Sequence, residues 1–97
     1  MSANRVNDAK NALQVEMQRE YKARIKQLGL IKSGRMLNDL TVVVTLNDDG
    51  FISHVKSTDY FPEVDELHGL TDYIINLPEI GNLMANLYGE IIIDILD

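Results

Sequence analysis

The sequence contains no cysteine and no tryptophan among its 97 residues. Without cysteine there is no disulfide, no thiolate zinc site and no thiol nucleophile, so the fold does not depend on an oxidising compartment. Any metal chemistry would rest on carboxylates and on the two histidines, His54 and His68. These absences exclude several classes of small enzyme and metal-stabilised domain.

Long apolar segments are also missing. The uninterrupted apolar runs are no longer than residues 91–93, which is far too short to span a bilayer. Residues 1–8 carry no apolar region of the kind found in a secretory signal. We therefore expect no contact with a membrane, and assembly in the cytoplasm.

The length of the chain suits one hydrophobic core, and no linker, repeat or low-complexity tract divides it. We expect a single domain over residues 1–97, with a free energy of unfolding of about 5–10 kcal/mol. A domain of this size has little sequence to spare for a deep active site.

Positive charge is scarce and lies mostly at one end. The net charge is −6, yet eight of the nine lysines and arginines fall in residues 1–35, and twelve of the fifteen acids fall in residues 36–97. Three arrangements fit this division: a basic helix neutralised by the acidic remainder of the same chain, head-to-tail contact between copies, and nucleic-acid binding. The last is disfavoured, because the bases alternate with acids.

Apolar residues recur every three or four positions at the start of the chain, which is the period of an amphipathic helix. The spacing predicts a helix over residues 4–28, ended by Gly29 in the left-handed conformation, with bases in its last turns near the negative end of the helix dipole. The residues that set the period are Val6, Ala9, Leu13, Met17, Tyr21, Ile25 and Leu28.

The middle of the chain predicts a short helix followed by a hairpin. Ser33 suits a helix N-cap, and apolar residues after it share one face for about two turns, as far as Leu40. Residues 41–46 are mostly β-branched, and a second strand-like segment follows at residues 51–56. The turn between them predicts a β-hairpin with Gly50 at positive φ.

The second half of the chain is harder to assign by period. Residues 59–69 fit a third short strand or a loop, and residues 71–77 fit a helical turn. Pro78 suits the first turn of a helix that continues to Leu96, although a glycine and three isoleucines leave residues 89–96 open between helix and strand. The predicted class is α+β: a long N-terminal helix, a short helix, a small antiparallel β-sheet with a central hairpin, and a C-terminal helix.

No arrangement of catalytic residues stands out. Ser33 lacks the flanking glycines of a nucleophile elbow, and neither Gly29 nor Gly34 is followed by the Lys-Ser/Thr pair of a P-loop. A metal-dependent hydrolase built on His54, His68 and the acids of residues 59–66 is disfavoured, because their spacing matches no known metal motif. We predict no catalytic residue, no cofactor and no metal, and hence an interaction or assembly protein rather than an enzyme.

Two segments stand in a distinctive order. IKSGRMLNDL at residues 31–40 lies between the predicted long helix and the hairpin, and DYFPEVDE at residues 59–66 follows the hairpin. This order and spacing resembles the tail-completion and head–tail joining proteins of the neck of tailed bacteriophages. In that family, a long basic helix leads into Ile-x-Ser/Thr-Gly-x-Leu-x-x-Ser-Ile. A β-hairpin comes next, followed by Asp-Tyr-x-x-Tyr/Val-Val-Glu-x-Gly and a C-terminal helix.

The resemblance implies a structural virion protein of the head–tail interface, assembled in the host cytoplasm. It would form a ring, often of six or twelve copies, between the portal or its adaptor and the tail tube. Its partners would be copies of itself, the portal or adaptor and the tail-tube proteins, while DNA passes through the ring without sequence-specific binding. The alternative is a small acidic cytoplasmic binding module, such as an inhibitor or adaptor. The residues expected to make contacts are Lys22, Arg24, Lys26, Arg35, Asp48, Asp49, Phe51, Asp59, Tyr60 and Phe61.

Overall fold

The computed structural model describes residues 2–30, 38–48, 50–57 and 61–96, with side chains from residue 4 onward. Its helices and strands confirm the predicted α+β class. Of the predicted short helix, Asn38 and Asp39 are helical and the residues from Ser33 to Leu37 lie outside the described ones. The elements are α1 (Ser2–Gln27), β1 (Thr41–Leu46), β2 (Phe51–Lys56), α3 (Phe61–His68), α4 (Leu70–Ile75) and α5 (Pro78–Leu96).

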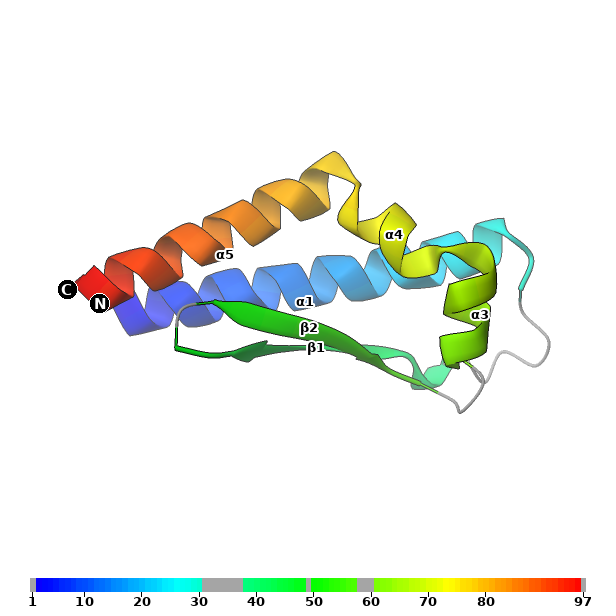
Figure 1. Ribbon diagram of the computed structural model, residues 1–97, viewed down its shortest axis with the longest axis horizontal. Helices are drawn as coiled ribbons and strands as arrows, with labels where there is room; N and C mark the ends of the chain where they lie inside the picture. Colours follow the sequence, from blue (N-terminus) through cyan, green and yellow to red (C-terminus); the bar gives the residue numbers. More distant parts are fainter. Residues whose placement is uncertain (1, 31–37, 49, 58–60, 97) are drawn as a thin grey trace.

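Helix α1 runs the length of the molecule and forms its middle layer (Figure 1). Helix α5 lies along one side of α1 and the β1–β2 hairpin lies along the other, with both chain termini at the same end. The molecule is elongated, with extents of 48 × 22 × 18 Å. Each of the other layers therefore buries its apolar side chains against α1.

The apolar stripe of α1 is buried from Val6 to Ile25, but the prediction was wrong for its last residue, Leu28, which is 37% exposed. The helix stops just before Gly29, as predicted. Gly29 has φ 68°, the N–H of Leu30 donates to the carbonyl of Ile25 at 3.1 Å, and the N–H of Gly29 donates to the carbonyl of Lys26 at 3.1 Å. This pair of bonds is the Schellman motif, which satisfies carbonyls left free at a helix end. The six stripe residues at most 6% exposed are Val6, Ala9, Leu13, Met17, Tyr21 and Ile25.

The hairpin has the predicted strands, paired from Thr41 opposite Lys56 to Leu46 opposite Phe51. The positive φ predicted for Gly50 was wrong, since positive φ among the described residues occurs at Gly29 and Gly69. The turn is closed instead by the N–H of Asn47, which donates to the carbonyl of Gly50 at 3.0 Å. Four residues connect the strands, so the turn does not need the left-handed geometry of a two-residue hairpin loop.

Helix α3 occupies a segment for which the sequence predicted a third short strand or a loop, and both alternatives were wrong for Phe61–His68. Phe61 begins the helix and is buried, Pro62 lies in the first turn where its missing N–H costs nothing, and Glu63 faces the positive end of the helix dipole. Gly69, at φ 61°, turns the chain from α3 into α4. The helical turn predicted at residues 71–77 corresponds to α4.

Helix α5 begins at Pro78 as predicted and continues without a break to Leu96, so residues 89–96 are helical. Ile80, Leu87 and Ile91 are buried at helical spacing. Packing of this face against α1 holds the isoleucine-rich end in a helix, in spite of its β-branched side chains.

Replacing Gly89 by alanine is expected to stabilise the protein. Gly89 is exposed inside α5 and an added Cβ would meet nothing within 4 Å, so the free energy of unfolding should rise by about 0.5–1 kcal/mol. Gly29→Ala is the matched control: it also has open space, but its positive φ should lower the stability by about 1 kcal/mol. Urea unfolding measures both, and shifts of the same sign would contradict this account.

Candidate functional site

The outer edge of β1 is closed by two side chains of α1. The N–H of Val42 donates to Oε1 of Gln18 at 3.2 Å, and the N–H of Val44 donates to Oε1 of Gln14 at 2.8 Å. Gln14 and Gln18 lie one helical turn apart, so their amides reach alternate residues of the strand. The outward N–H groups of Val42 and Val44 are therefore already used, whereas that of Leu46, at the turn end of the strand, is not used by any bond among the described residues.

The outer edge of β2 is open. Antiparallel pairs alternate between bonded and non-bonded, and Asn47 is bonded to Gly50, so the groups of Phe51, Ser53 and Val55 point away from β1. Within the described part of the chain, no hydrogen bond reaches these outward groups. The strand therefore presents unpaired donors and acceptors to solvent.

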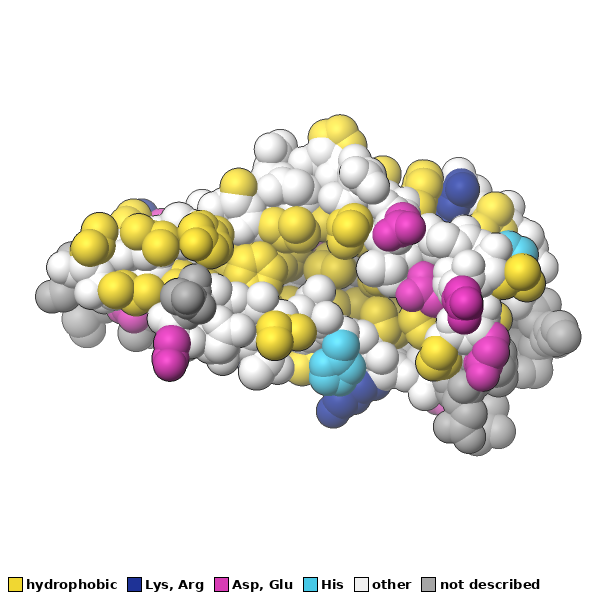
Figure 2. Space-filling model, viewed as in Figure 1, with side chains coloured by type: hydrophobic (Ala, Val, Ile, Leu, Met, Phe, Trp, Pro, Cys, Tyr) yellow, Lys and Arg dark blue, Asp and Glu magenta, His cyan; other side chains and the backbone are white. Residues whose placement is uncertain are grey.

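A hollow of about 280 Å³ lies beside this edge, at the end of β2 nearest α3. Met17 and Tyr21 of α1 contribute apolar lining, and Figure 2 shows hydrophobic side chains in the band between α5 and the hairpin. The hollow thus combines an apolar surface with an open strand edge. Its other lining residues are Val42, Ser53, His54, Val55, Phe61, Pro62, Asp65 and Thr71.

A chain of hydrogen bonds borders the hollow. The hydroxyl of Thr71 donates to Oδ2 of Asp65 at 2.7 Å, so the hydroxyl of Tyr21, 2.8 Å away, is the donor to Thr71. The backbone N–H of Thr71 donates to Oδ1 of Asp65 at 2.7 Å. Because Thr71 stands in the first turn of α4, Asp65 satisfies a free amide at that helix end. These bonds join α1, α3 and α4.

The stability of the protein is expected to fall above about pH 10 because of Tyr21. Burial raises the pKa of its phenol above the usual 10.0, and the charge of Asp65 adds to this rise. As the pH rises, the unfolded chain loses this proton first. Its contribution to stability is therefore complete below about pH 10 and is lost as the pH rises through the higher pKa of the folded state.

Urea titrations of the wild type and of Tyr21→Phe between about pH 8 and pH 11 test this expectation. The stability of the wild type should fall more steeply at the alkaline end than that of the variant. Parallel curves would show that Tyr21 is not the group responsible.

Large apolar side chains are exposed on the C-terminal half of α5 and on the hairpin. Figure 2 shows hydrophobic side chains gathered over α5 towards the end that holds the termini. Leu96 is 79% exposed and Ile52 is 62% exposed, which is unusual for side chains of this size. We call the exposed apolar side chains of α5 the apolar patch: Tyr88, Ile93, Ile95 and Leu96.

Three of the predicted contact residues lie on the last turns of α1. Lys22 and Lys26 are one turn apart and outside the core stripe: Lys22 is half-buried beside β1 and Lys26 is exposed. No ion pair within the described residues engages them. Arg24 is half-buried and makes contacts within the chain. Its guanidinium lies 3.9 Å from the centre of the Tyr73 ring and donates to Gln27 at 3.2 Å.

The other predicted contact residues are spread over the chain. Asp48 is exposed at the hairpin turn and Phe51 is partly buried at the start of β2. Phe61 lies in the core, 6% exposed, with its ring edge-on to Tyr21 at 5.9 Å between centroids. The remaining four, Arg35, Asp49, Asp59 and Tyr60, lie outside the described residues.

One ion pair joins the basic N-terminal part to the acidic remainder within the described residues. Arg5 contacts both carboxylate oxygens of Glu90, each at 3.1 Å, and Glu90 is only 9% exposed. The other ion pair, Arg19 with Glu16, lies within α1. Among the described residues, ion pairing across these two parts of the chain thus uses one base and one acid.

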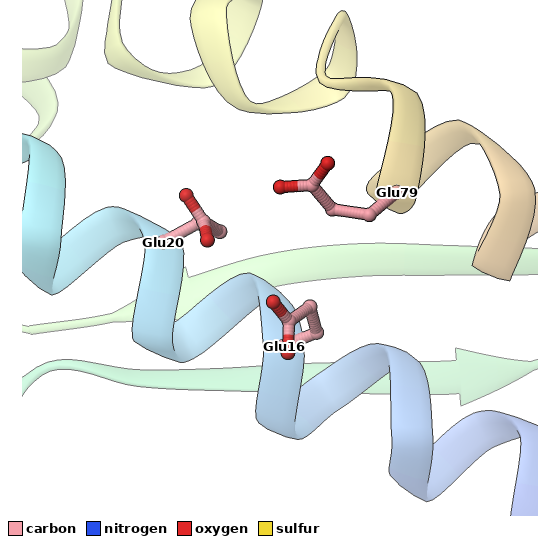
Figure 3. A group of neighbouring side chains, drawn as sticks. All are labelled: Glu16, Glu20 and Glu79. Atoms are coloured by element: carbon pink, nitrogen blue, oxygen red, sulfur yellow. The ribbon is translucent and has the colours of Figure 1, made fainter.

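Three carboxylates meet between α1 and α5 (Figure 3). Glu16 and Glu20 lie one turn apart on α1 and Glu79 lies in the first turn of α5, with carboxylate oxygens within 4.8 Å of one another. Such oxygens could hold a divalent cation. Arg19 already supplies a positive charge: its hydrogen bond to Glu16, followed by the charges of Glu16, Glu20 and Glu79, raises its pKa above the usual value.

The histidines considered for a metal site are both exposed, His54 on β2 and His68 at the end of α3. In the described residues, neither belongs to a group of three side chains close enough to share a metal ion. The residues that do form such a group were not singled out from the sequence.

None of the helices in the described ranges is both long and apolar enough to cross a membrane. Comparison with protein-family models, with curated proteins and with solved structures finds no match to this chain.

Proposed function

We propose that this chain is a structural protein of the neck of tailed bacteriophages, which assembles with copies of itself into a ring joining the portal or its adaptor to the tail. The segments at residues 31–40 and 59–66, before and after the hairpin, support this family. The observation that carries an assembly role is the apolar patch, which a protein acting alone would leave in water.

The distribution of charge supports contact between copies. Lys22 and Lys26 lie on the last turns of α1 outside its core stripe, whereas Glu63, Glu66 and Asp72 are exposed on α3 and α4. Opposite charges on two different surfaces of one subunit favour head-to-tail contacts, which close into a ring when the rotation between copies allows it. An acidic inner wall would repel DNA phosphates and let DNA pass without binding.

The test is quantitative mass spectrometry of purified tailed particles from the source of this sequence, counting this chain against the portal protein. On a twelve-fold portal, a ring of six or twelve copies gives a ratio of about one-half or about one. Absence of the chain from intact particles would overturn the proposal.

Reversing the charges of Lys22 and Lys26 together to glutamate is expected to block assembly and leave the monomer folded. Both side chains are outside the core stripe and take part in no ion pair among the described residues, so stability should change by less than about 1 kcal/mol. Complementation counts of joined particles measure assembly, and urea unfolding measures the fold.

Replacing the same two lysines by glutamine is the matched control, which removes charge without reversing it and should weaken assembly less. Arg24 is left unchanged in both variants because it packs on Tyr73. Normal numbers of joined particles with the reversed pair would exclude this charge contact.

The exposed acids of α3 and α4 favour a second candidate, a cytoplasmic module that covers a basic surface of another protein. Affinity capture on the purified chain, followed by mass spectrometry, separates the two. Recovery of one basic host protein and no virion protein would favour the binding module.

A further inference from the structure

The outer edge of β2 is open, whereas side chains of α1 cover the outer edge of β1. Gln14 and Gln18 accept from the outward N–H groups of Val42 and Val44 on β1. Within the described residues, no hydrogen bond reaches the outward groups of Phe51, Ser53 and Val55 on β2. Natural sheets protect exposed edges with bulges, prolines, charges or covering elements. Strand β2 has no proline, and Lys56 is the one charged residue in it. A regular edge of this kind can pair with another extended chain.

The lining of the hollow beside the edge determines which side chains an added strand would need. Phe51, Ser53 and Val55 share a face with Val42 and Val44, which are buried against α1. Alternate side chains of a third strand would point the same way, towards Met17 and Tyr21, where the lining is apolar. The side chains between them would point to solvent.

The charges at the α3 end of the hollow determine which residues would suit the end of the segment that lies there. Asp65 lines the hollow, and Glu63 and Glu66 are exposed on the same helix. Lys56 at the end of β2 offsets one of these three charges. The acidic excess favours lysine or arginine in the part of the segment that lies over α3.

A second copy fits this edge poorly. Since β1 is closed, the strand that another copy could offer from its described residues is its own β2, paired antiparallel about Ser53. That pairing carries the turn of the copy, with Asp48, towards the α3 end, where it would meet Glu63 and Asp65. Like charges at both ends of a two-fold contact oppose it.

We propose that β2 accepts one extended segment of another protein as a third strand. The segment carries apolar residues at alternate positions, facing the hollow, and basic residues at the end over α3. This is β-strand addition, in which backbone hydrogen bonds supply affinity and the pocket supplies selectivity. This pairing does not depend on whether the protein belongs to a phage particle or acts elsewhere in the cell.

Amide hydrogen exchange of the purified full chain, read by NMR, tests the pairing directly. In the free monomer, the amides of Ile52, His54 and Lys56 should be protected by β1, and those of Phe51, Ser53 and Val55 should exchange freely. The probe is a synthetic peptide with a core of alternating valine and threonine and two lysines at each end. On its addition, the three outward amides should slow about tenfold or more.

Two control peptides define the chemistry. The first replaces the lysines by glutamates and should bind about tenfold more weakly, because it meets the acids of α3. The second has proline at the central position, which cannot donate to β2, and should give no protection. Equal binding of the first, or protection by the second, would overturn the proposal.

A matched pair of variants locates the site. Ser53→Lys places a charge on the face of β2 that is turned towards the hollow, whereas Ile52→Lys places the same charge on the opposite face at the neighbouring residue, which does not line the hollow. Both side chains are exposed, so both variants should fold. Ser53→Lys should weaken peptide binding about tenfold, and Ile52→Lys by less than about twofold. Equal effects would place the peptide elsewhere.

Two results with the free chain would also count against the proposal. Protection of Phe51, Ser53 and Val55 at low concentration without peptide would mean that the edge is already paired within the molecule. Protection that grows with protein concentration, together with dimer formation in sedimentation, would mean that a second copy is the occupant.

Discussion

Replacing Val44 by aspartate is expected to leave the chain unfolded at neutral pH. Val44 is 3% exposed, and its side chain lies on the face of β1 that packs against α1. A carboxylate there would be buried without a partner, which costs about 4 kcal/mol or more, a large part of the total stability expected for a domain of this size. Far-UV circular dichroism and urea unfolding measure the loss.

Thr45→Asp is the matched control, because Thr45 is the next residue along β1 and is exposed. It introduces the same charge with the same low β-propensity, and should lower the free energy of unfolding by less than about 1 kcal/mol. If the two variants unfolded at the same urea concentration, the hairpin would not be packed on α1 as the structure has it.

The same burial explains why the long helix and the hairpin could be predicted from the sequence. Every turn of α1 places an apolar residue on one side, from Val6 to Ile25, and all of them are buried. The β-branched run at residues 41–46 and the turn residues after it leave few alternatives to a hairpin. Where the local pattern and the burial in the folded protein agree, the pattern is sufficient to predict the helix or strand.

Helix α3 could not be predicted in this way, because it is too short for its period to be read. Its contacts are tertiary: Phe61 packs on Tyr21, and Asp65 binds the first turn of α4 through Thr71. The available signal was Pro62 followed by Glu63, which is typical of a first helical turn. At Gly50 the local pattern misled in a different way. Its residue type indicated positive φ, but the four-residue turn does not require it.

The features of the candidate site depend on which elements lie side by side, which a local pattern does not specify. The spacing of Gln14 and Gln18 is visible in the sequence, but the amides they cap are 24 to 30 residues away. Glu79 joins Glu16 and Glu20 through the packing of α5 on α1. The sequence shows that such side chains share one side of a helix, and the fold decides what that side meets.

Replacing Leu87 by alanine is expected to cost about 2–5 kcal/mol. Leu87 is fully buried, on the face of α5 that packs against α1, and its removal would leave a cavity in the contact between the two longest helices. The neighbouring Tyr88 is half exposed and belongs to the apolar patch. Tyr88→Ala should therefore cost less than about 1 kcal/mol in urea unfolding.

The comparison of these two neighbours separates the fold from the proposed assembly surface. Leu87→Ala should lower assembly only as far as it lowers the amount of folded chain, and a lower growth temperature should restore both together. Tyr88→Ala should leave the amount of folded chain unchanged and lower its incorporation into particles about tenfold, because a large aromatic side chain in an apolar contact carries much of the binding energy. If Tyr88→Ala particles contained the normal number of copies, the apolar patch would not be the surface through which the protein assembles.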